Sequence, residues 1–345
     1  MQRIAITGAS GFIGTALVNA LTARGHAVVG LDQHAPIEPL ATDAFIQGDI
    51  RDADALGEAF EGADIVHHLA ALPSIARAEE LEYWQVNVAG TRAVLRAARL
   101  AGVSHFVHMS SSTVYGTPAR SPLDESAPLA PQNPYSRTKA AAEEAVQLAA
   151  KAGMPCSIIR PRVVVGRGRA GVFSLLFHFI ARDLPIPLPG GGHNYFQFTA
   201  VKDLVEAAIA TSETSPGDEC PILNIGSHVN APLRTDLEQL IDFAGSTSRI
   251  IPLPSAPMRW TLGAMHQFGL SPLVPEQYQI MEKDFVLDTT LAQERIGFSP
   301  RYANGEGLLE AWTWWRKHLG PGGMGDLMSH WQMRHQNALQ RRGGQ

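Results

Sequence analysis

The chain has 345 residues, of which 45% are hydrophobic and 18% are charged, and its formal net charge is −5. This composition is that of a folded globular protein and excludes the disordered, fibrous and disulfide-stapled classes. The negative charge gives no electrostatic reason to expect nucleic acid or an anionic membrane as a partner. The two cysteines, Cys156 and Cys220, lack metal-ligand spacing, so we expect buried thiols and no metal site.

The sequence carries no signal for insertion into a membrane. No uninterrupted apolar stretch reaches the roughly 20 residues that a membrane span requires. The opening residues MQRIAITG run directly into an apolar strand, without the charged, apolar and small-residue regions of a secretory signal. We therefore expect no integral membrane span and a cytoplasmic location.

The first half alternates short apolar runs with helical patterns, which is typical of βαβ units around a parallel sheet. Near-continuous runs of Val, Ile, Leu and Phe favour strands that are buried on both faces. Strands are predicted at 4–7, 27–32, 44–49, 64–71, 105–111 and 156–161, and helices at 12–24, 52–60, 82–101 and 135–152. The predicted fold class is α/β, a Rossmann-type doubly wound parallel sheet.

The pattern changes after Pro161, where prolines and glycines cluster. Helices are predicted there at 172–182, 201–212, 234–244 and 305–318, with one strand at 221–226. We predict a first domain at 1–160, a smaller α/β substrate-binding region at 161–320 that is interleaved with it, and an accessory or disordered tail at 321–345.

The segment TGASGFIG (7–14) follows the first strand and opens the first helix. Glycines at such a turn let the backbone approach a pyrophosphate and allow close packing of helix against strand. The phosphates would lie at the helix N-terminus, where unpaired N–H groups and the positive end of the helix dipole favour an anion. The spacing Gly-x-x-Gly-x-x-Gly departs from the generic fingerprint, so the segment alone also fits an ordinary glycine turn.

An acidic residue strengthens the dinucleotide interpretation. Asp32 ends the second predicted strand, where a carboxylate would accept a hydrogen bond from the ribose 2′-hydroxyl of NAD. A 2′-phosphate would be repelled there, and residues 33–37 contain no Arg to receive one, so the sequence favours NAD over NADP. Asp49 follows the third strand and is a candidate for the adenine amino group, with a turn or N-cap aspartate as the alternative.

The stretch NPYSRTKAAAEEA (133–145) places Tyr135 and Lys139 four residues apart at the start of an alanine-rich helical pattern. Side chains four apart lie on one face of a helix, so a phenol and an ammonium would project side by side. By itself this pair also fits an ordinary helix surface. Upstream, MSSSTVYG (109–116) follows a strand at the edge where open α/β sheets hold their ligands.

Together these motifs resemble the extended short-chain dehydrogenase/reductase family, of the NAD-dependent epimerase/dehydratase type. The match covers roughly residues 1–318, and its motifs are TGASGFIG, Asp32, GDI (48–50), HLAA (68–71), NVAGT (87–91), SSSTVYG, YSRTK, RPRVVVGRG (160–168) and LDTTLAQERIGFSP (287–300). The resemblance implies NAD as the cofactor, and residues 1–160 as the NAD-binding domain. It implies cofactor contacts by Gly8, Gly11, Phe12, Ile13, Gly14, Asp32, Asp49, Ile50, Leu69, Ala70, Ala71, Asn87, Tyr135 and Lys139.

The resemblance also implies a catalytic set of Ser111, Tyr135 and Lys139. A tyrosine with its ordinary pKa of about 10 is a poor base at neutral pH, but an adjacent ammonium and a positive nicotinamide both favour the phenolate. Ser111 would hold a substrate hydroxyl whose proton goes to Tyr135, while its hydride goes to the nicotinamide. His67 and His68, on the preceding strand, are expected to be packed histidines rather than ligands.

The substrate is less well defined. Ser112 and Thr113 stand where dehydratases of the family carry an Asp-Glu pair, which disfavours dehydration, and decarboxylation is disfavoured for want of an acidic residue. Phe196 or Gln197 occupies the expected place of an arginine that clamps a diphosphate, and Arg162 or Lys283 is a possible replacement. The candidate substrate residues are Ser112, Thr113, Arg162 and Gln197.

Three functions stay open. The first is a nucleotide-sugar epimerase, and the second is a secondary-alcohol dehydrogenase or reductase on an apolar, non-nucleotide substrate. The apolar stretch 257–281 fits either a lid over such a substrate or a packing helix. The third is a non-catalytic NAD-binding protein. The resemblance further implies a homodimer through the helices at 88–101 and 138–152. The weakly amphipathic segment 325–342 fits a tail, intrachain packing, or contact with a membrane surface or partner helix.

Overall fold

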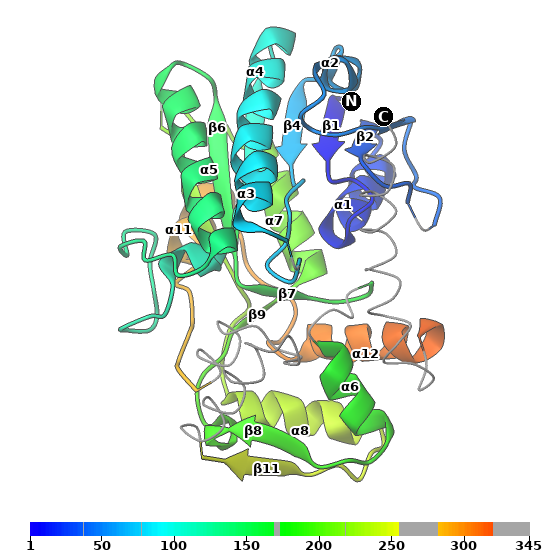
Figure 1. Cartoon of the computed structure of the whole chain (residues 1–345), viewed down its shortest axis with the longest axis vertical. Helices are drawn as coiled ribbons and strands as arrows, with labels where there is room; N and C mark the ends of the chain where they lie inside the picture. The colour runs from blue at the N-terminus through cyan, green and yellow to red at the C-terminus, as the bar shows by residue number, and fades with distance from the viewer. Residues whose placement is uncertain (37, 77, 169–172, 218, 255–281, 320–345) are drawn as a thin grey trace. The chain divides into compact units, whose positions relative to one another are not determined.

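The computed structural model describes residues 1–36, 38–76, 78–168, 173–217, 219–254 and 282–319 (Figure 1). The chain divides into two compact units. The first contains residues 1–164, 195–230 and 283–304, and the second contains residues 165–194, 231–282 and 305–345. Residues 195–230 and 283–304 return to the first unit because they supply its last strand and two of its helices. The stretch 255–281 and the segment 320–345 lie outside the described residues, and so do the predictions made for them.

The first unit is built on a parallel sheet of seven strands in the order β10-β6-β5-β4-β1-β2-β3. This sheet confirms the predicted α/β Rossmann-type fold. The strand order changes direction between β1 and β4, and ligands of such sheets bind beyond the carboxyl ends of the strands at that point. The strands are β1 (Arg3–Thr7), β2 (Ala27–Asp32), β3 (Ala44–Gln47), β4 (Ile65–His68), β5 (His105–Met109), β6 (Cys156–Pro161) and β10 (Ile222–Ile225).

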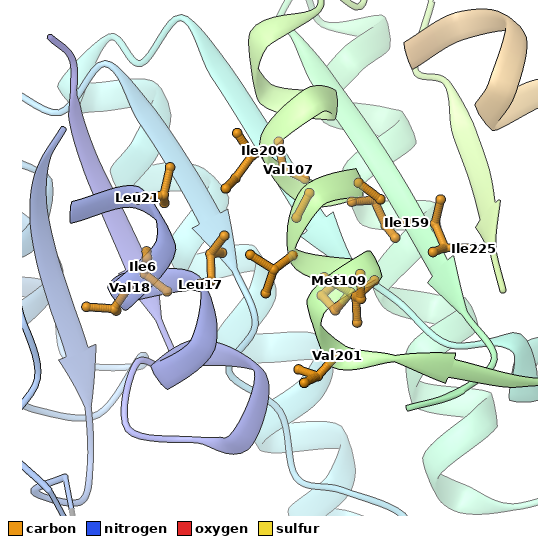
Figure 2. Close-up of a cluster of buried hydrophobic side chains, with 14 of the residues drawn as sticks. Ile6, Leu17, Val18, Leu21, Val107, Met109, Ile159, Val201, Ile209 and Ile225 are labelled. Atoms are coloured by element: carbon orange, nitrogen blue, oxygen red, sulfur yellow. The ribbon is translucent and has the colours of Figure 1, made fainter. Parts of the chain in front are cut away.

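Each face of the sheet is covered by helices, because alternate strand residues point to opposite faces. Helices α1 (Phe12–Ala23) and α7 (Val201–Glu213) pack on each other over one face. Figure 2 shows the apolar side chains between them and the sheet, among them Leu17, Met109 and Ile159. The other face is covered by α2 (Ala53–Phe60), α4 (Thr91–Ala101) and α5 (Pro134–Lys151). A short helix, α11 (Thr290–Ile296), packs against β10 and α7.

The helix predicted at 82–101 is present, but it is not α-helical throughout. The structure has α3 (Glu80–Tyr83), then a π-helical segment at Trp84–Gly90, and only then α4. π-Helical turns occur mostly as local insertions in α-helices, often at functional positions. Here the wider turn holds Asn87 inward, where its Oδ1 accepts a hydrogen bond from the Leu72 N–H at 2.7 Å.

The second unit carries helices α6 (Phe173–Ala181), α8 (Leu233–Phe243) and α12 (Glu306–His318), together with a parallel pair of strands, β8 (Ile186–Pro189) and β11 (Ile250–Leu253). The sequence pattern misses this pair because both strands contain proline. It also misses α11, a short 3-10 turn η3 (Gly190–Gly192), and the pair β7 (Val163–Val165) and β9 (Phe198–Ala200). The core of this unit includes the stacked rings of Trp312 and Trp315.

None of the helices in the described ranges is long and apolar enough to cross a membrane. The cytoplasmic location stays a prediction.

Candidate active site

The turn between β1 and α1 requires glycine at two positions. Gly8 has φ +75°, and a Cβ there would stand 2.7 Å from the backbone nitrogen of Ala70. A Cβ at Gly14 would stand 2.1 Å from the Gly8 carbonyl oxygen. Contacts this short leave no space for a side chain. The turn is held by the Gly8 N–H, which donates to the Leu31 carbonyl at 2.8 Å.

Helix α1 begins with no side-chain cap. Its N-cap residue is Gly11, and Phe12, Ile13 and Gly14 form its first turn. The first N–H groups of a helix have no partner within the helix, and with the helix dipole they favour an anion. The structure therefore brings the glycine turn and an uncapped helix start together at the carboxyl end of β1. This arrangement fits a pyrophosphate group.

Asp32 lies beside this turn. Its carboxylate accepts hydrogen bonds from the Ser10 N–H at 3.2 Å and the His34 N–H at 3.0 Å. An acidic group is thus fixed at the end of β2, next to the glycines, as the sequence predicts for a ribose-binding residue.

Asp49 adopts the alternative that the sequence left open. It accepts from the Arg51 backbone N–H at 2.9 Å and forms an ion pair with the Arg51 guanidinium. The hydrogen bonds from the Arg51 guanidinium to the Asp49 carboxylate are the main cause that raises the pKa of Arg51. The Gln33 side chain also donates to Asp49, at 2.6 Å. Asp49 is therefore a turn aspartate in this structure, and its contact with adenine stays a prediction.

The segment that follows β4 lies against the glycine turn between β1 and α1. The Ala70 N–H donates to Thr7 Oγ1 at 3.3 Å, and Asn87 holds Leu72 through both its carbonyl and its amide. Asn87 also donates to Thr138 Oγ1 at 3.0 Å, which connects the segment after β4 to helix α5. Leu69, Ala70 and Ala71 are thereby fixed as the wall beside the glycines. Ile50, also predicted to contact the cofactor, is buried in the core between the sheet and helices α2, α4 and α5.

Ser111 follows β5 at the carboxyl edge of the sheet. It is the N-cap of a 3-10 turn, η2 (Ser112–Tyr115), and its Oγ accepts from the Thr113 N–H at 3.3 Å and from the Thr113 hydroxyl at 3.0 Å. Thr113 therefore orients the Ser111 hydroxyl. Ser112 is 1% exposed, so its side chain faces the interior of the first unit.

Helix α5 carries Tyr135 and Lys139 and starts with a strong local signal. The Asn133 side chain accepts from the Ser136 N–H, the Ser136 hydroxyl bonds back to the Asn133 backbone, and Pro134 occupies the first helical position. This reciprocal capping fixes where the helix begins, so Tyr135 falls in its first turn. Helix α5 packs against η2, which brings the segment after Ser111 to the helix that carries the tyrosine and the lysine.

Lys139 is buried, and its Nζ donates to the Met109 carbonyl at 2.6 Å. Met109 is the last residue of β5, two residues before Ser111. Burial lowers the pKa of Lys139 to about 8, because a buried ammonium loses its hydration. The lysine is held at the carboxyl end of the sheet by the strand that leads to the serine.

A buried network that the sequence did not predict connects α5 to η2. Arg160 on β6 donates to both carboxylate oxygens of Glu143, at 2.9 and 2.6 Å, and to the Tyr115 hydroxyl at 2.8 Å. The Tyr115 hydroxyl donates in turn to Asn224 Oδ1 at 2.8 Å. Because Glu143 lies one turn after Lys139 and Tyr115 ends η2, this network sets the serine turn against the helix of the tyrosine.

The remaining substrate candidates are buried. The Arg162 guanidinium lies over the rings of Phe196 and Phe285, at 4.5 and 3.9 Å from their centroids, and its Nη2 has no partner among the described residues. Burial lowers the pKa of Arg162 to about 9. Gln197 is occupied by backbone groups, donating to the Ser227 carbonyl and accepting from the Leu287 N–H, both at 2.8 Å.

Comparison with known proteins assigns the chain to one family. The model of the NAD dependent epimerase/dehydratase family matches residues 4–226. The chain belongs to this family, which is part of the extended short-chain dehydrogenase/reductases and contains enzymes. NAD is the cofactor of the family, so the prediction of NAD is confirmed.

Individual relatives differ in substrate. The chain is 32% identical to UDP-glucose 4-epimerase of Mycolicibacterium smegmatis, over 91% of this chain and 99% of that protein. It is 30% identical to 4-hydroxy-2-methyl-3-oxo-4-farnesyl-3,4-dihydroquinoline-1-oxide ketoreductase of Stigmatella aurantiaca, over 94% and 99% of the two chains. A solved structure of MoeE5 in complex with UDP-glucose and NAD covers 92% of this chain and all of that one, with a TM-score of 0.74 and 26% identity.

Proposed function

We propose that the chain is an NAD-dependent nucleotide-sugar epimerase that works through Ser111, Tyr135 and Lys139. The observation that carries this proposal is the arrangement of β5, η2 and α5. Lys139 donates a hydrogen bond to the last residue of β5, and Ser111 follows that strand by two residues. Helix α5, which carries Tyr135 and Lys139, packs against η2, the turn that follows Ser111. These are the three side chains that the family resemblance identifies.

The residues around the glycine turn fit NAD. The uncapped start of α1 and the tight glycine turn before it suit a pyrophosphate, and Asp32 suits a ribose hydroxyl. The proposed cofactor contacts on these elements are Gly8, Gly11, Phe12, Ile13, Gly14, Asp32, Asp49, Ile50, Leu69, Ala70, Ala71 and Asn87, with Tyr135 and Lys139 at the nicotinamide end. The first unit is accordingly the NAD-binding part of the chain.

In this mechanism bound NAD supplies the acceptor for a hydride. Ser111 holds the substrate hydroxyl, with its own hydroxyl oriented by Thr113. Tyr135 takes the proton of that hydroxyl, and the ammonium of Lys139 favours the phenolate form that can do so. Return of the hydride to the opposite face of the oxidised carbon, together with the proton from Tyr135, would complete an epimerisation without net redox change, whereas release of the oxidised product would give a dehydrogenase.

The nucleotide-sugar substrate is supported by the two comparisons with UDP-glucose in their names. We propose Arg162 as the donor to a diphosphate oxygen, in place of the arginine missing at Phe196 or Gln197. Its guanidinium stacks on the Phe196 ring, and its Nη2 lacks a partner in the described part of the chain. A buried cation without a carboxylate partner is costly, and an anionic substrate would reduce that cost.

The second candidate is an NAD-dependent dehydrogenase or reductase that acts on an apolar secondary alcohol or ketone. The ketoreductase relative, whose named substrate bears a farnesyl group, favours it. Dehydration remains disfavoured on the residues themselves, because Ser112 and Thr113 offer no carboxylate for acid–base elimination of water. A non-catalytic NAD-binding role would leave the buried Lys139 and the capped α5 without a purpose.

The test measures the purified protein with UDP-glucose and NAD. An epimerase converts UDP-glucose to its 4-epimer without net NADH, whereas a dehydrogenase produces NADH in proportion to substrate. Tyr135→Phe is expected to reduce turnover by roughly a hundredfold or more, since it removes the acid–base group. Tyr302→Phe, a tyrosine outside the proposed site, serves as the matched control and should keep full activity. Full turnover by Tyr135→Phe would contradict the mechanism.

We also propose a homodimer through the outer faces of α4 and α5, which pack side by side (Figure 1). Leu100 at the end of α4 is 80% exposed, and Leu148 on α5 is 57% exposed. Ala140 and Ala141 on α5 are small enough for a second helix to approach closely. A second copy of the chain would cover these apolar side chains.

A further inference from the structure

A pair of buried histidines lies behind the proposed catalytic lysine. His68 on β4 and His108 on β5 are register partners, and their ring centroids are 5.3 Å apart. His68 is anchored at both ring nitrogens, to Thr7 Oγ1 at 2.7 Å and to Thr91 Oγ1 at 2.9 Å. His108 instead presents its Nε2 to the Nζ of Lys139 at 3.4 Å.

The protonation state of His108 follows from its surroundings. Burial first, and then the charges of Lys139 and His68, hold the pKa of His108 well below its usual value. Burial and Lys139 likewise lower the pKa of His68 to about 3. Both rings are therefore neutral at physiological pH. A neutral imidazole has one bare nitrogen, and only a bare Nε2 can face an ammonium favourably.

This tautomer has a cost that calls for an explanation. If Nε2 is bare, the proton lies on Nδ1, which is buried and has no hydrogen-bond partner among the described residues. An unpartnered buried N–H is unfavourable, and natural proteins rarely keep one without a use. The use that the geometry offers is the contact with Lys139.

The other groups around Lys139 show what His108 contributes to holding its ammonium. Met109 supplies a carbonyl at 2.6 Å, and Glu143, one helical turn further on, raises the pKa of Lys139 but is itself paired with Arg160. Tyr135 precedes Lys139 by one turn of the same helix. The Met109 carbonyl and His108 Nε2 therefore both contact the ammonium from the last two residues of β5.

We propose that His108 is a positioning residue for Lys139. Its neutral Nε2 accepts from the ammonium, keeps it charged, and together with the Met109 carbonyl fixes it at the end of β5. This inference rests on the proposed function, in which Lys139 binds the nicotinamide ribose and assists Tyr135. It assigns a reason for a histidine, rather than an aliphatic residue, at this buried strand position.

The first measurement is the affinity for NAD as a function of pH, with NAD binding detected by the quenching of tryptophan fluorescence. In the wild-type protein the affinity should fall above about pH 8, as Lys139 loses its proton. His108→Leu removes the acceptor, so the pH midpoint of this fall in NAD affinity should move down by about one pH unit. That shift corresponds to a roughly tenfold change in the acid dissociation constant of Lys139. In the turnover assay the alkaline limb of kcat/KM should move in the same direction.

Two matched variants separate positioning from packing. His108→Gln can place an acceptor near the position of Nε2, whereas His108→Asn can place one only near Nδ1. Gln is expected to restore the wild-type midpoint, and Asn is not. His67→Leu removes an equally buried histidine from the neighbouring position on β4, so it should lower the melting temperature and leave the midpoint unchanged.

The outcomes are decisive for the inference. A wild-type midpoint in His108→Leu, or equal midpoints in the Gln and Asn variants, would overturn it. If the Leu variant does not fold, the Gln and Asn pair still decides. The proposed function is tested separately, because full turnover by Tyr135→Phe would contradict it. The pH midpoint of NAD binding in the His108 variants is measured without any sugar substrate, so it tests the role of His108 alone.

Discussion

Replacing Lys139 with methionine should make the ligand-free protein more stable while it abolishes activity. Methionine has nearly the same length and volume as lysine, so the substitution leaves the packing of α5 almost unchanged. It removes an ammonium that the fold buries. Turnover should be lost because the group that favours the phenolate of Tyr135 is gone.

The size of the gain follows from the pKa of the lysine. A fall from the ordinary 10.5 to about 8 corresponds to about 3 kcal/mol at 1.36 kcal/mol per unit. Loss of the hydrogen bond to the Met109 carbonyl offsets about 1 kcal/mol of this. We therefore expect the free energy of unfolding to rise by about 2 kcal/mol at pH 7.

The pH dependence supplies a sharper test. Below pH 8 both the folded and the unfolded wild-type protein carry the proton, so the folded state bears the whole cost. Between pH 8 and 10.5 the unfolded state binds more protons than the folded state, so wild-type stability rises relative to the variant. Above about pH 10.5 the cost of the charge is gone and only the lost hydrogen bond remains, so the difference should change sign and the variant should be less stable by about 1 kcal/mol. Urea unfolding of NAD-free protein at several pH values measures it, and a variant that is less stable at pH 7, or a difference independent of pH, would refute the reasoning.

Three further predictions concern other parts of the first unit. Asp32→Ala should weaken NAD binding at least about tenfold and weaken NADP binding much less, because the repulsion of a 2′-phosphate is removed; an unchanged ratio of the two dissociation constants would contradict this. If the proposed dimer forms, Leu148→Glu should convert it to monomers in light scattering, whereas Lys151→Glu, at the end of the same helix, should not; a Leu148→Glu variant that stays dimeric would exclude the α5 face. Tyr115→Phe should cost about 1–2 kcal/mol in urea unfolding, since it removes the hydroxyl that joins Arg160 to Asn224; unchanged stability would show that the network contributes nothing at this position.

Much of the fold could be predicted from the sequence because its signals are local. Buried parallel strands read as continuous apolar runs, the glycines of the first turn are required by backbone contacts, and the start of α5 is set by Asn133 and Pro134. The strand predicted at 221–226 is present as β10, but nothing local in its sequence indicates that it pairs with β6.

The parts that escaped prediction depend on long-range contacts. Glu143 reads as one more solvent-facing charge on an alanine-rich helix, and only the folded sheet brings Arg160 to it. His108 looked like an ordinary strand residue, although the alternation in HFVHM (105–109) places it on the same face as Phe106. That pattern could have identified the face of the sheet but not the lysine that α5 sets against it.

Strand β10 comes about 60 residues after β6 in the sequence, although the two strands pair in the sheet, and this has a consequence while the chain is being synthesised. A nascent polypeptide that has emerged only to residue 164 contains every other strand of the sheet but leaves one side of β6 without a neighbour. An uncovered strand edge is a template for pairing with another chain. Ribosome-bound or truncated forms that end before Ile222 should therefore be the species that aggregate or recruit chaperones, and protein production would benefit from keeping residues 222–225 in any shortened form.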